Sequence, residues 1–142
     1  PAPVLASSAE AAAVLRAEAE IAESLELATR ADLLIVGVGT LEDNHLAHMG
    51  ELSARDIESL RKKGVVGDMS SRFFDADGRP VALSVDDRVI ALTLDEHRAI
   101  PMRVAIAGGP AKREALKAAA RGGLYNVLVT DSDTGAWLVE HT

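Results

Sequence analysis

The chain has 142 residues, 48% of them apolar, which is enough for one globular domain with a buried core. Its 22 acidic and 15 basic residues give a formal charge of −7, which argues against direct contact with the phosphate backbone of DNA or RNA. The chain has no cysteine, which excludes disulfides and thiolate metal sites, and no run of roughly 20 apolar residues that could cross a bilayer. We therefore expect a cytoplasmic protein without a membrane partner.

Two helices are predicted before the first strand. Ser7 or Ser8 can cap a helix that extends to about Arg16, and helical periodicity predicts a second helix over residues 20–30. The apolar run at 33–37 then has the composition of a buried strand.

A glycine-rich turn that ends in Gly39 and Thr40 follows this strand and leads into a polar loop. The next predicted helix covers residues 53–63. Ser53 can act as its N-cap, and Asp56, three residues later, completes an imperfect capping box.

The middle of the chain predicts short strands separated by turns. Residues 65–67 form an apolar strand signal, and residues 75–78 have the composition of a hairpin turn. Further short strands are predicted at 81–83 and 89–92. A brief helix over 93–98 then leads to the last third of the chain.

The last third reads as a strand, a helix and a second strand. Residues 104–107 predict a strand buried on both faces, and Gly108 and Gly109 then allow a sharp turn. An alanine-rich helix follows, with Lys112 in its first turn. The strand predicted over 126–130 runs parallel to the first, because a crossover helix of this length suits a parallel connection.

Strands alternating with helices predict an α/β fold with a mainly parallel sheet flanked by helices, built from strands near 33–37, 65–67, 103–107 and 126–130. In open α/β sheets, ligands bind beyond the carboxyl ends of the strands. Six residues at these ends form the predicted effector-binding set: Gly39, Thr40, Asp68, Gly108, Gly109 and Lys112.

The chemistry of this set suits a small phosphorylated sugar or polyol. Backbone amides at the glycine turns and the Lys112 ammonium can receive an anion, and Asp68 can accept hydrogen bonds from sugar hydroxyls. Alternatively, the glycines are ordinary turn residues, Asp68 caps a loop and Lys112 is a solvated helix residue. His45 and His48 have no third ligand in view, so we predict no metal site, and no cofactor is predicted.

Several segments occur in a distinctive order and spacing: 67–78, 87–92, 100–101, 107–109 with Lys112, 121–123 and 126–131. Together they resemble the effector-binding domain of the SorC-type bacterial sugar-responsive transcriptional regulators. The resemblance extends from about Pro3 to the C-terminus. It implies a fold related to the sugar-phosphate isomerase and CoA-transferase group. It also places the effector-contacting acid at Asp68, the contacting lysine at Lys112 and a third contacting turn at Gly39 and Thr40.

In that family, the resemblance implies, an N-terminal helix-turn-helix binds an operator, and this domain binds a phosphorylated sugar that changes the oligomeric state and the DNA affinity. Residues 1–142 would then be the C-terminal portion of a sugar-binding effector domain, and DNA would be contacted only through the absent N-terminal domain. One departure is Ser71, which stands where the family normally has glycine.

We therefore expect an effector-sensing domain, active as a homo-oligomer, and not an enzyme; no catalytic residue is predicted. Two alternatives remain open. A sugar-phosphate isomerase-like enzyme would need a general base, for which Asp68 is the only plausible candidate. The chain could also be an oligomerisation fragment without a complete ligand site.

Overall fold

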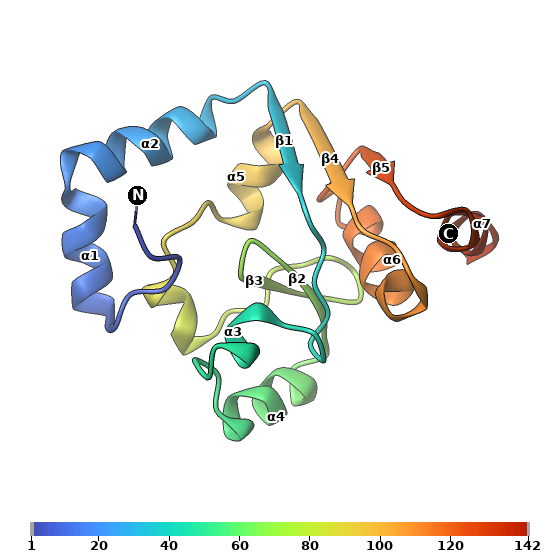
Figure 1. Ribbon diagram of the computed structural model, residues 1–142, viewed down its shortest axis with the longest axis horizontal. Helices are drawn as coiled ribbons and strands as arrows, with labels where there is room; N and C mark the ends of the chain where they lie inside the picture. Colours follow the sequence, from blue (N-terminus) through green and yellow to red (C-terminus); the bar gives the residue numbers. More distant parts are fainter. Residues whose placement is uncertain (1, 142) are drawn as a thin grey trace.

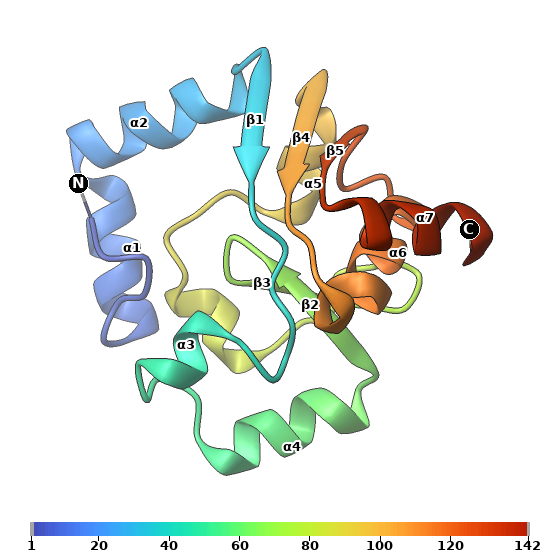
Figure 2. The same cartoon turned by 45° about the vertical axis from the view of Figure 1, so that its right-hand side comes forward.

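The computed structural model describes residues 2–141 and contains a three-strand parallel sheet, a two-strand antiparallel hairpin and surrounding helices (Figure 1). The helices α1 and α2 lie on one side of the molecule and α6 and α7 on the other, as Figure 1 and Figure 2 both show. Within these residues no helix is long and apolar enough to cross a bilayer. In chain order the elements are α1 (Ala9–Ala17), α2 (Ala19–Thr29), β1 (Leu33–Val36), α3 (His45–His48), α4 (Ala54–Lys62), β2 (Val65–Met69), β3 (Arg72–Asp75), the 3-10 helix η1 (Ser84–Arg88), α5 (Leu94–Ala99), β4 (Met102–Ile106), the 3-10 helix η2 (Pro110–Lys112), α6 (Arg113–Arg121), β5 (Val127–Val129) and α7 (Ser132–His141).

Local sequence signals determine where several helices begin. Ser8 caps α1 by accepting a hydrogen bond of 3.1 Å from a backbone amide one turn on. Ser53 and Asp56 form a reciprocal capping box at the start of α4, and Thr93 opens α5 in the same way. The predictions of these helices, and of α2, are confirmed.

The parallel sheet has the strand order β1-β4-β5. Leu33 pairs with Met102 across β1 and β4, and Val104 pairs with Val127 across β4 and β5. The connection from β4 to β5 runs through α6, which makes the predicted βαβ unit. The prediction of an α/β fold with a parallel sheet flanked by helices is therefore confirmed.

The strand predicted at 65–67 does not join this sheet. It is part of β2, which pairs with β3 in an antiparallel hairpin. Ser70 and Ser71 make the turn with φ angles of 51° and 63°, and a left-handed backbone at both central positions matches the twist of the two strands. Residues 75–78 also reverse the chain, as predicted, but they lead to an isolated bridge between Phe74 and Pro80 and not to a strand.

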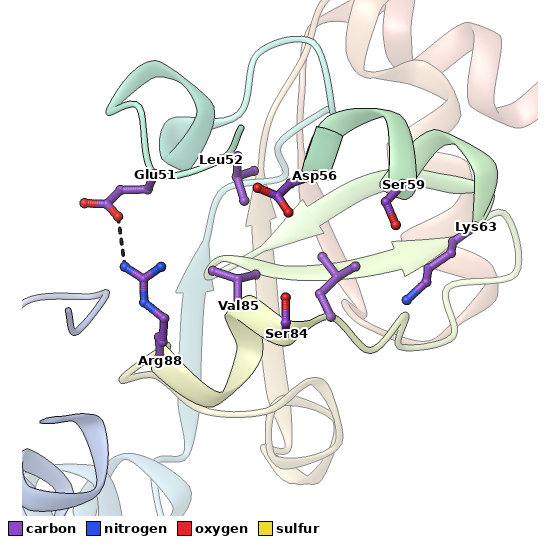
Figure 3. Close-up of a pocket in the computed structure, with 9 residues that line it drawn as sticks. Glu51, Leu52, Asp56, Ser59, Lys63, Ser84, Val85 and Arg88 are labelled. Carbon is purple, nitrogen blue, oxygen red and sulfur yellow. Dashed lines mark hydrogen bonds and ion pairs between the residues drawn. The ribbon is translucent and has the colours of Figure 1, made fainter. Parts of the chain in front are cut away.

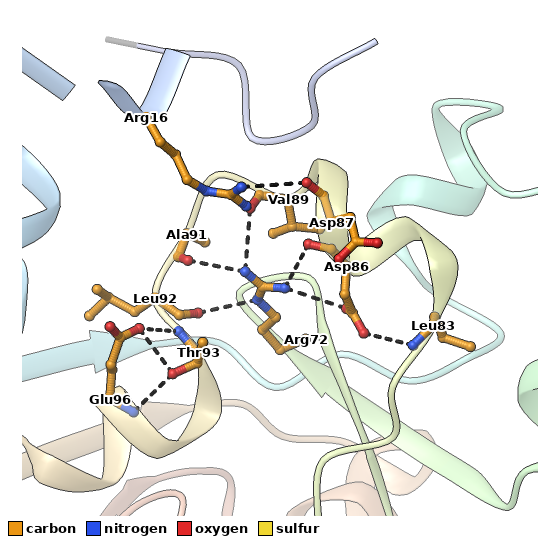
Figure 4. Close-up of polar contacts among 10 residues, drawn as sticks. All are labelled: Arg16, Arg72, Leu83, Asp86, Asp87, Val89, Ala91, Leu92, Thr93 and Glu96. Atoms are coloured by element: carbon orange, nitrogen blue, oxygen red, sulfur yellow. Dashed lines mark hydrogen bonds and ion pairs between the residues drawn. The ribbon is translucent and has the colours of Figure 1, made fainter. Parts of the chain in front are cut away.

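The strands predicted at 81–83 and 89–92 are wrong, and for the second of them the Arg72 side chain gives the reason (Figure 4). Its guanidinium donates hydrogen bonds of 3.0 to 3.4 Å to carbonyl groups along this irregular segment, those of Asp86, Val89, Ala91 and Leu92. It also lies 3.5 Å from the Asp86 carboxylate. A side chain therefore satisfies the carbonyls that a sheet would have paired.

The core is divided between two clusters that meet at β3. Phe74 belongs to the cluster between the parallel sheet and α6, with Ala105 and Leu116. Phe73 points to the opposite side, into the cluster with Leu60 below α4. Both phenylalanines are buried, because consecutive side chains of one strand point to opposite faces and each face here meets a core cluster.

One face of the parallel sheet is exposed, which contradicts the prediction of strands buried on both faces. Alternate residues along the three strands point to this face, and their side chains are 42% to 61% exposed. They are all apolar: Leu33, Ile35, Met102, Ile106, Val127 and Val129. The apolar composition of these strands therefore reflects a sheet whose second face is uncovered in this chain.

Replacing Arg72 with methionine should destabilise the chain, because four carbonyl groups lose their shared donor. Losing one partner of a buried hydrogen bond costs about 1 to 3 kcal/mol, so Arg72→Met should lower the free energy of unfolding by at least about 2 kcal/mol. Arg79→Met is the matched control, since the Arg79 side chain is 71% exposed in the turn after β3. Urea unfolding measures both variants, and equally small losses would contradict a structural role for Arg72.

Candidate functional site

Two backbone hydrogen bonds join the end of the β1 segment to β2. The amide of Gly39 donates to the Asp68 carbonyl at 2.9 Å, and the amide of Asp68 donates to the Gly39 carbonyl at 3.2 Å. A Cβ atom at position 39 would overlap the Asp68 carboxylate, so only glycine fits beside it. The structure thus places two of the predicted site residues side by side.

The Asp68 carboxylate is partly buried and fixed by hydrogen bonds. It accepts one from the Asn44 side-chain amide at 2.9 Å and one from the backbone amide of Ser71 in the hairpin turn. Burial raises the pKa of Asp68, while these hydrogen bonds and the charge of Lys112 act in the opposite direction. The carboxylate is therefore held in one orientation. Its pKa remains sensitive to a ligand that adds further hydrogen bonds.

Lys112 ends η2 and brings a positive charge to the same region. Its Nζ lies 3.6 Å from Asp43 Oδ2, and its side chain is 22% exposed. Thr40 is buried close to Asp43, and its hydroxyl accepts a hydrogen bond of 3.2 Å from the Asp43 amide. The site thus combines the Lys112 ammonium, the Asp68 carboxylate and a loop that the hydrogen bond between Thr40 and Asp43 holds in place.

The turn at Gly108 and Gly109 is bound by the chain itself. The Gly109 amide donates to Asp131 Oδ2 at 2.7 Å and to the Thr134 hydroxyl at 3.1 Å. A Cβ atom at Gly108 would overlap the Asp131 carboxylate. Asp131 Oδ1 also accepts a hydrogen bond of 2.8 Å from the Thr134 amide, so this carboxylate links the turn to the start of α7. The Gly109 amide was predicted to donate a hydrogen bond to an anionic ligand. It already donates one to the Asp131 carboxylate.

Two further residues belong to the site and were not predicted from the sequence. Asn44 contacts Asp68, and Asp43 contacts Lys112. Asn44 is 1% exposed, and its side chain also caps α3 by accepting a hydrogen bond from the Leu46 amide at 2.9 Å. An asparagine in a polar loop, two residues before Leu46, is the signal that could have revealed this cap. The contact with Asp68 depends on the path of the loop and has no local signature.

Two hollows differ in their relation to this site. A hollow of about 300 Å³ adjoins it, lined by Thr40 and by Ala111, the residue before Lys112. The larger cavity, of about 430 Å³, lies between α4 and η1 and contains none of the six predicted residues (Figure 3).

The charged groups of the larger cavity have partners within the chain. Arg88 pairs with Glu51 at 3.0 Å, Lys63 donates to the Ala82 carbonyl at 2.8 Å, and Asp56 belongs to the α4 capping box. We place the candidate site at Asp68 and Lys112, because these oppositely charged groups meet the loop after Gly39 and Thr40, whereas this cavity contains none of the predicted residues. Among the described residues no group of three or more His, Cys, Asp or Glu side chains is arranged to hold a metal ion.

The geometry defines an α/β domain with a small polar site where the ends of β1 and β2 meet η2. Residues 1–140 match the protein family described as "Putative sugar-binding domain", and the chain belongs to this family. The transcriptional regulator LsrR from Escherichia coli K12 is 41% identical over 140 residues, which are 96% of this chain and 44% of LsrR. The chain therefore spans less than half the length of this relative.

Solved structures agree with this assignment. A DeoR family transcriptional regulator from Listeria monocytogenes has a TM-score of 0.89 and 40% sequence identity, covering 96% of this chain and 56% of that one. The full-length sorbitol operon regulator SorC from Klebsiella pneumoniae has the same fold, with a TM-score of 0.89 and 22% identity over 98% of this chain and 45% of its own. The chain is thus a sugar-binding domain similar to those of LsrR and of the DeoR family regulator, both of which are transcriptional regulators.

The Asp131 contact predicts a pH-dependent stability. Hydrogen bonds from the Thr134 and Gly109 amides lower the pKa of Asp131 from 3.8 to about 2. A depressed folded-state pKa means that the ionised carboxylate stabilises the fold above pH 3.8 and loses this effect as the pH falls through about 2. Asp131→Asn should lower the melting temperature at pH 7, and its difference from wild type should shrink towards pH 2.

Asp133→Asn is the matched control for this prediction, because it removes a carboxylate from the first turn of the same helix. Thermal unfolding followed by circular dichroism from pH 7 to pH 2 provides the measurement. A difference between Asp131→Asn and wild type that stays constant over this range would contradict the assigned role.

Proposed function

We propose that this chain is the C-terminal portion of the effector domain of a cytoplasmic bacterial transcriptional regulator. It binds a small phosphorylated sugar or polyol, and binding controls the DNA affinity of an N-terminal domain of the longer protein. The proposal rests on one observation above all. Asp68 and Lys112 come from different elements and both contact the loop after β1, so a ligand at this loop meets a carboxylate and an ammonium together.

The two charges suit the two parts of such a ligand. An ammonium forms charge-assisted hydrogen bonds with phosphate oxygens, and an oriented carboxylate accepts hydrogen bonds from hydroxyl groups. The hollow lined by Thr40 and Ala111 provides space for a small molecule beside the site. The names of the relatives support the regulatory role, since LsrR and SorC are both transcriptional regulators.

Lys112→Ala or Asp68→Asn should weaken effector binding at least tenfold in the full-length regulator. Each change removes a charged hydrogen-bond partner, a loss of about 1.5 to 3 kcal/mol. Calorimetric titration with a panel of phosphosugars measures the affinity. The matched controls are Lys62→Ala and Asp77→Asn, whose side chains pair with Glu58 and Arg79 on exposed surfaces elsewhere.

Both variants should keep the fold. Burial of the ionised Asp68 carboxylate opposes folding, so asparagine at this position should not lower stability at neutral pH. Affinities that match those of wild type in both variants would mean that Asp68 is a turn acid and Lys112 an ordinary helix residue.

We also propose that the protein acts as a homo-oligomer, since the exposed apolar face of the parallel sheet favours association. This chain should sediment as a dimer or larger species at high concentration, and Ile35→Lys, at the most exposed apolar residue of that face, should shift it towards monomer. Val139→Lys is the matched control, because Val139 is 85% exposed on α7, away from the sheet. A strictly monomeric wild-type chain in analytical ultracentrifugation would contradict this proposal.

A further inference from the structure

The loop from Thr40 to Asn44 supplies a partner for each charged residue of the candidate site. Asn44 donates a hydrogen bond of 2.9 Å to the Asp68 carboxylate, and Asp43 Oδ2 lies 3.6 Å from Lys112 Nζ. The loop is tied together by the hydrogen bond from the Asp43 amide to the Thr40 hydroxyl. One short segment thus contacts both the acidic and the basic part of the site.

The two contacts differ in their chemistry. Asn44 is neutral and buried, and it adds a donor to Asp68. Asp43 is an exposed carboxylate, and it presents to Lys112 the same kind of charge that a phosphate group would present. An anionic ligand at Lys112 must therefore displace Asp43 or bind beside it against like-charge repulsion.

Two groups on different elements hold the Asp43 carboxylate. Its Oδ1 lies 3.1 Å from His48 Nε2 on α3, and its Oδ2 faces Lys112 on η2. The hydrogen bond with His48, and after it the charge of Lys112, lowers the pKa of Asp43, so the group is ionised at neutral pH. The neighbouring Glu42 points elsewhere, with its carboxylate 3.8 Å from Arg61 on α4.

We propose that Asp43 is a specificity-determining residue of this site, because its carboxylate pairs with the Lys112 ammonium and so competes with anionic ligands for it. The proposal rests on the proposed role of Lys112 as the cation that contacts phosphate. Asp43 lowers the affinity for phosphorylated ligands and leaves the affinity for uncharged sugars unchanged, so it sets how strongly the site responds to ligand charge.

The test uses the full-length regulator and defined probes. Ribose 5-phosphate, glucose 6-phosphate and inorganic phosphate are titrated by calorimetry, with ribose and glucose as their uncharged counterparts. Asp43→Asn should raise the affinity for the phosphorylated probes about two- to fivefold, the range that corresponds to removing one exposed ion pair. Affinity for the uncharged sugars should stay the same.

Glu42→Gln is the matched control, since it removes one negative charge from the same loop without touching the Lys112 pair. A gain in Asp43→Asn that exceeds the gain in Glu42→Gln, and that disappears in a Lys112→Ala background, supports the proposal. Equal gains in both variants, or a gain that persists without Lys112, would overturn it. If Lys112→Ala itself leaves phosphosugar affinity unchanged, the proposed function of the site fails as well.

A ligand-free measurement decides the same point independently of the probes. The pKa of the Asp43 carboxyl, followed by carbon NMR during a pH titration, should rise towards its ordinary value in Lys112→Ala, because one of the two groups that stabilise the ionised form is removed. An Asp43 pKa that does not change in this variant would show that the two side chains do not pair and would overturn the proposal.

Discussion

The candidate site depends on the pair of backbone hydrogen bonds between Gly39 and Asp68. They connect the segment that leaves the parallel sheet to the antiparallel hairpin, which belongs to a separate sheet. Packing of Met69 and Phe74 against Ala105 and Leu116 places the hairpin beside the sheet and α6, and the two hydrogen bonds fix Asp68 against the end of the β1 segment. The contact requires glycine at position 39, because the Asp68 carboxylate fills the space that a side chain would need.

The charged groups of the candidate site have partners within the chain. Asn44 and the Ser71 amide hold Asp68, Asp43 holds Lys112, and the Gly109 amide is bound by Asp131. Such internal partners keep charged groups oriented and avoid unsatisfied polar atoms in a partly buried place. A ligand therefore exchanges one set of hydrogen bonds for another. Its binding free energy is the difference between the free energies of the contacts it makes and of the internal contacts it replaces. Substitutions in the partners should therefore change affinity in either direction.

Local signals predicted much of the fold. Capping residues such as Ser53 and Thr93 act within one helical turn, and the β4-α6-β5 unit lies within a continuous stretch, so both could be predicted from the sequence. The hairpin turn at Ser70 and Ser71 was missed because its left-handed backbone lacks the glycine that usually marks it. The strand expected at 89–92 was wrong because the side chain of Arg72, at least 17 residues earlier, donates hydrogen bonds to its carbonyl groups.

Only part of the candidate site could be predicted, because local signals do not specify contacts between segments that are distant in the sequence. The rule that ligands bind at the carboxyl ends of parallel strands pointed to Gly39 and Lys112, and to Asp68 on the wrong premise that its strand belongs to the parallel sheet. The structure nevertheless brings the three residues into one region. The roles of Asp43 and Asn44 depend on the path of an irregular loop, and the Asp131 contact links residues 22 positions apart. None of these contacts has a periodic or motif signature.

The most direct test of the central claim is an amide NMR titration of the full-length regulator with the phosphosugar that binds most tightly. We expect the largest chemical-shift changes at the amides of Gly39, Thr40, Asp68 and Lys112. Shifts centred on Ser59, Ser84 and Val85, which line the larger cavity between α4 and η1, would contradict it.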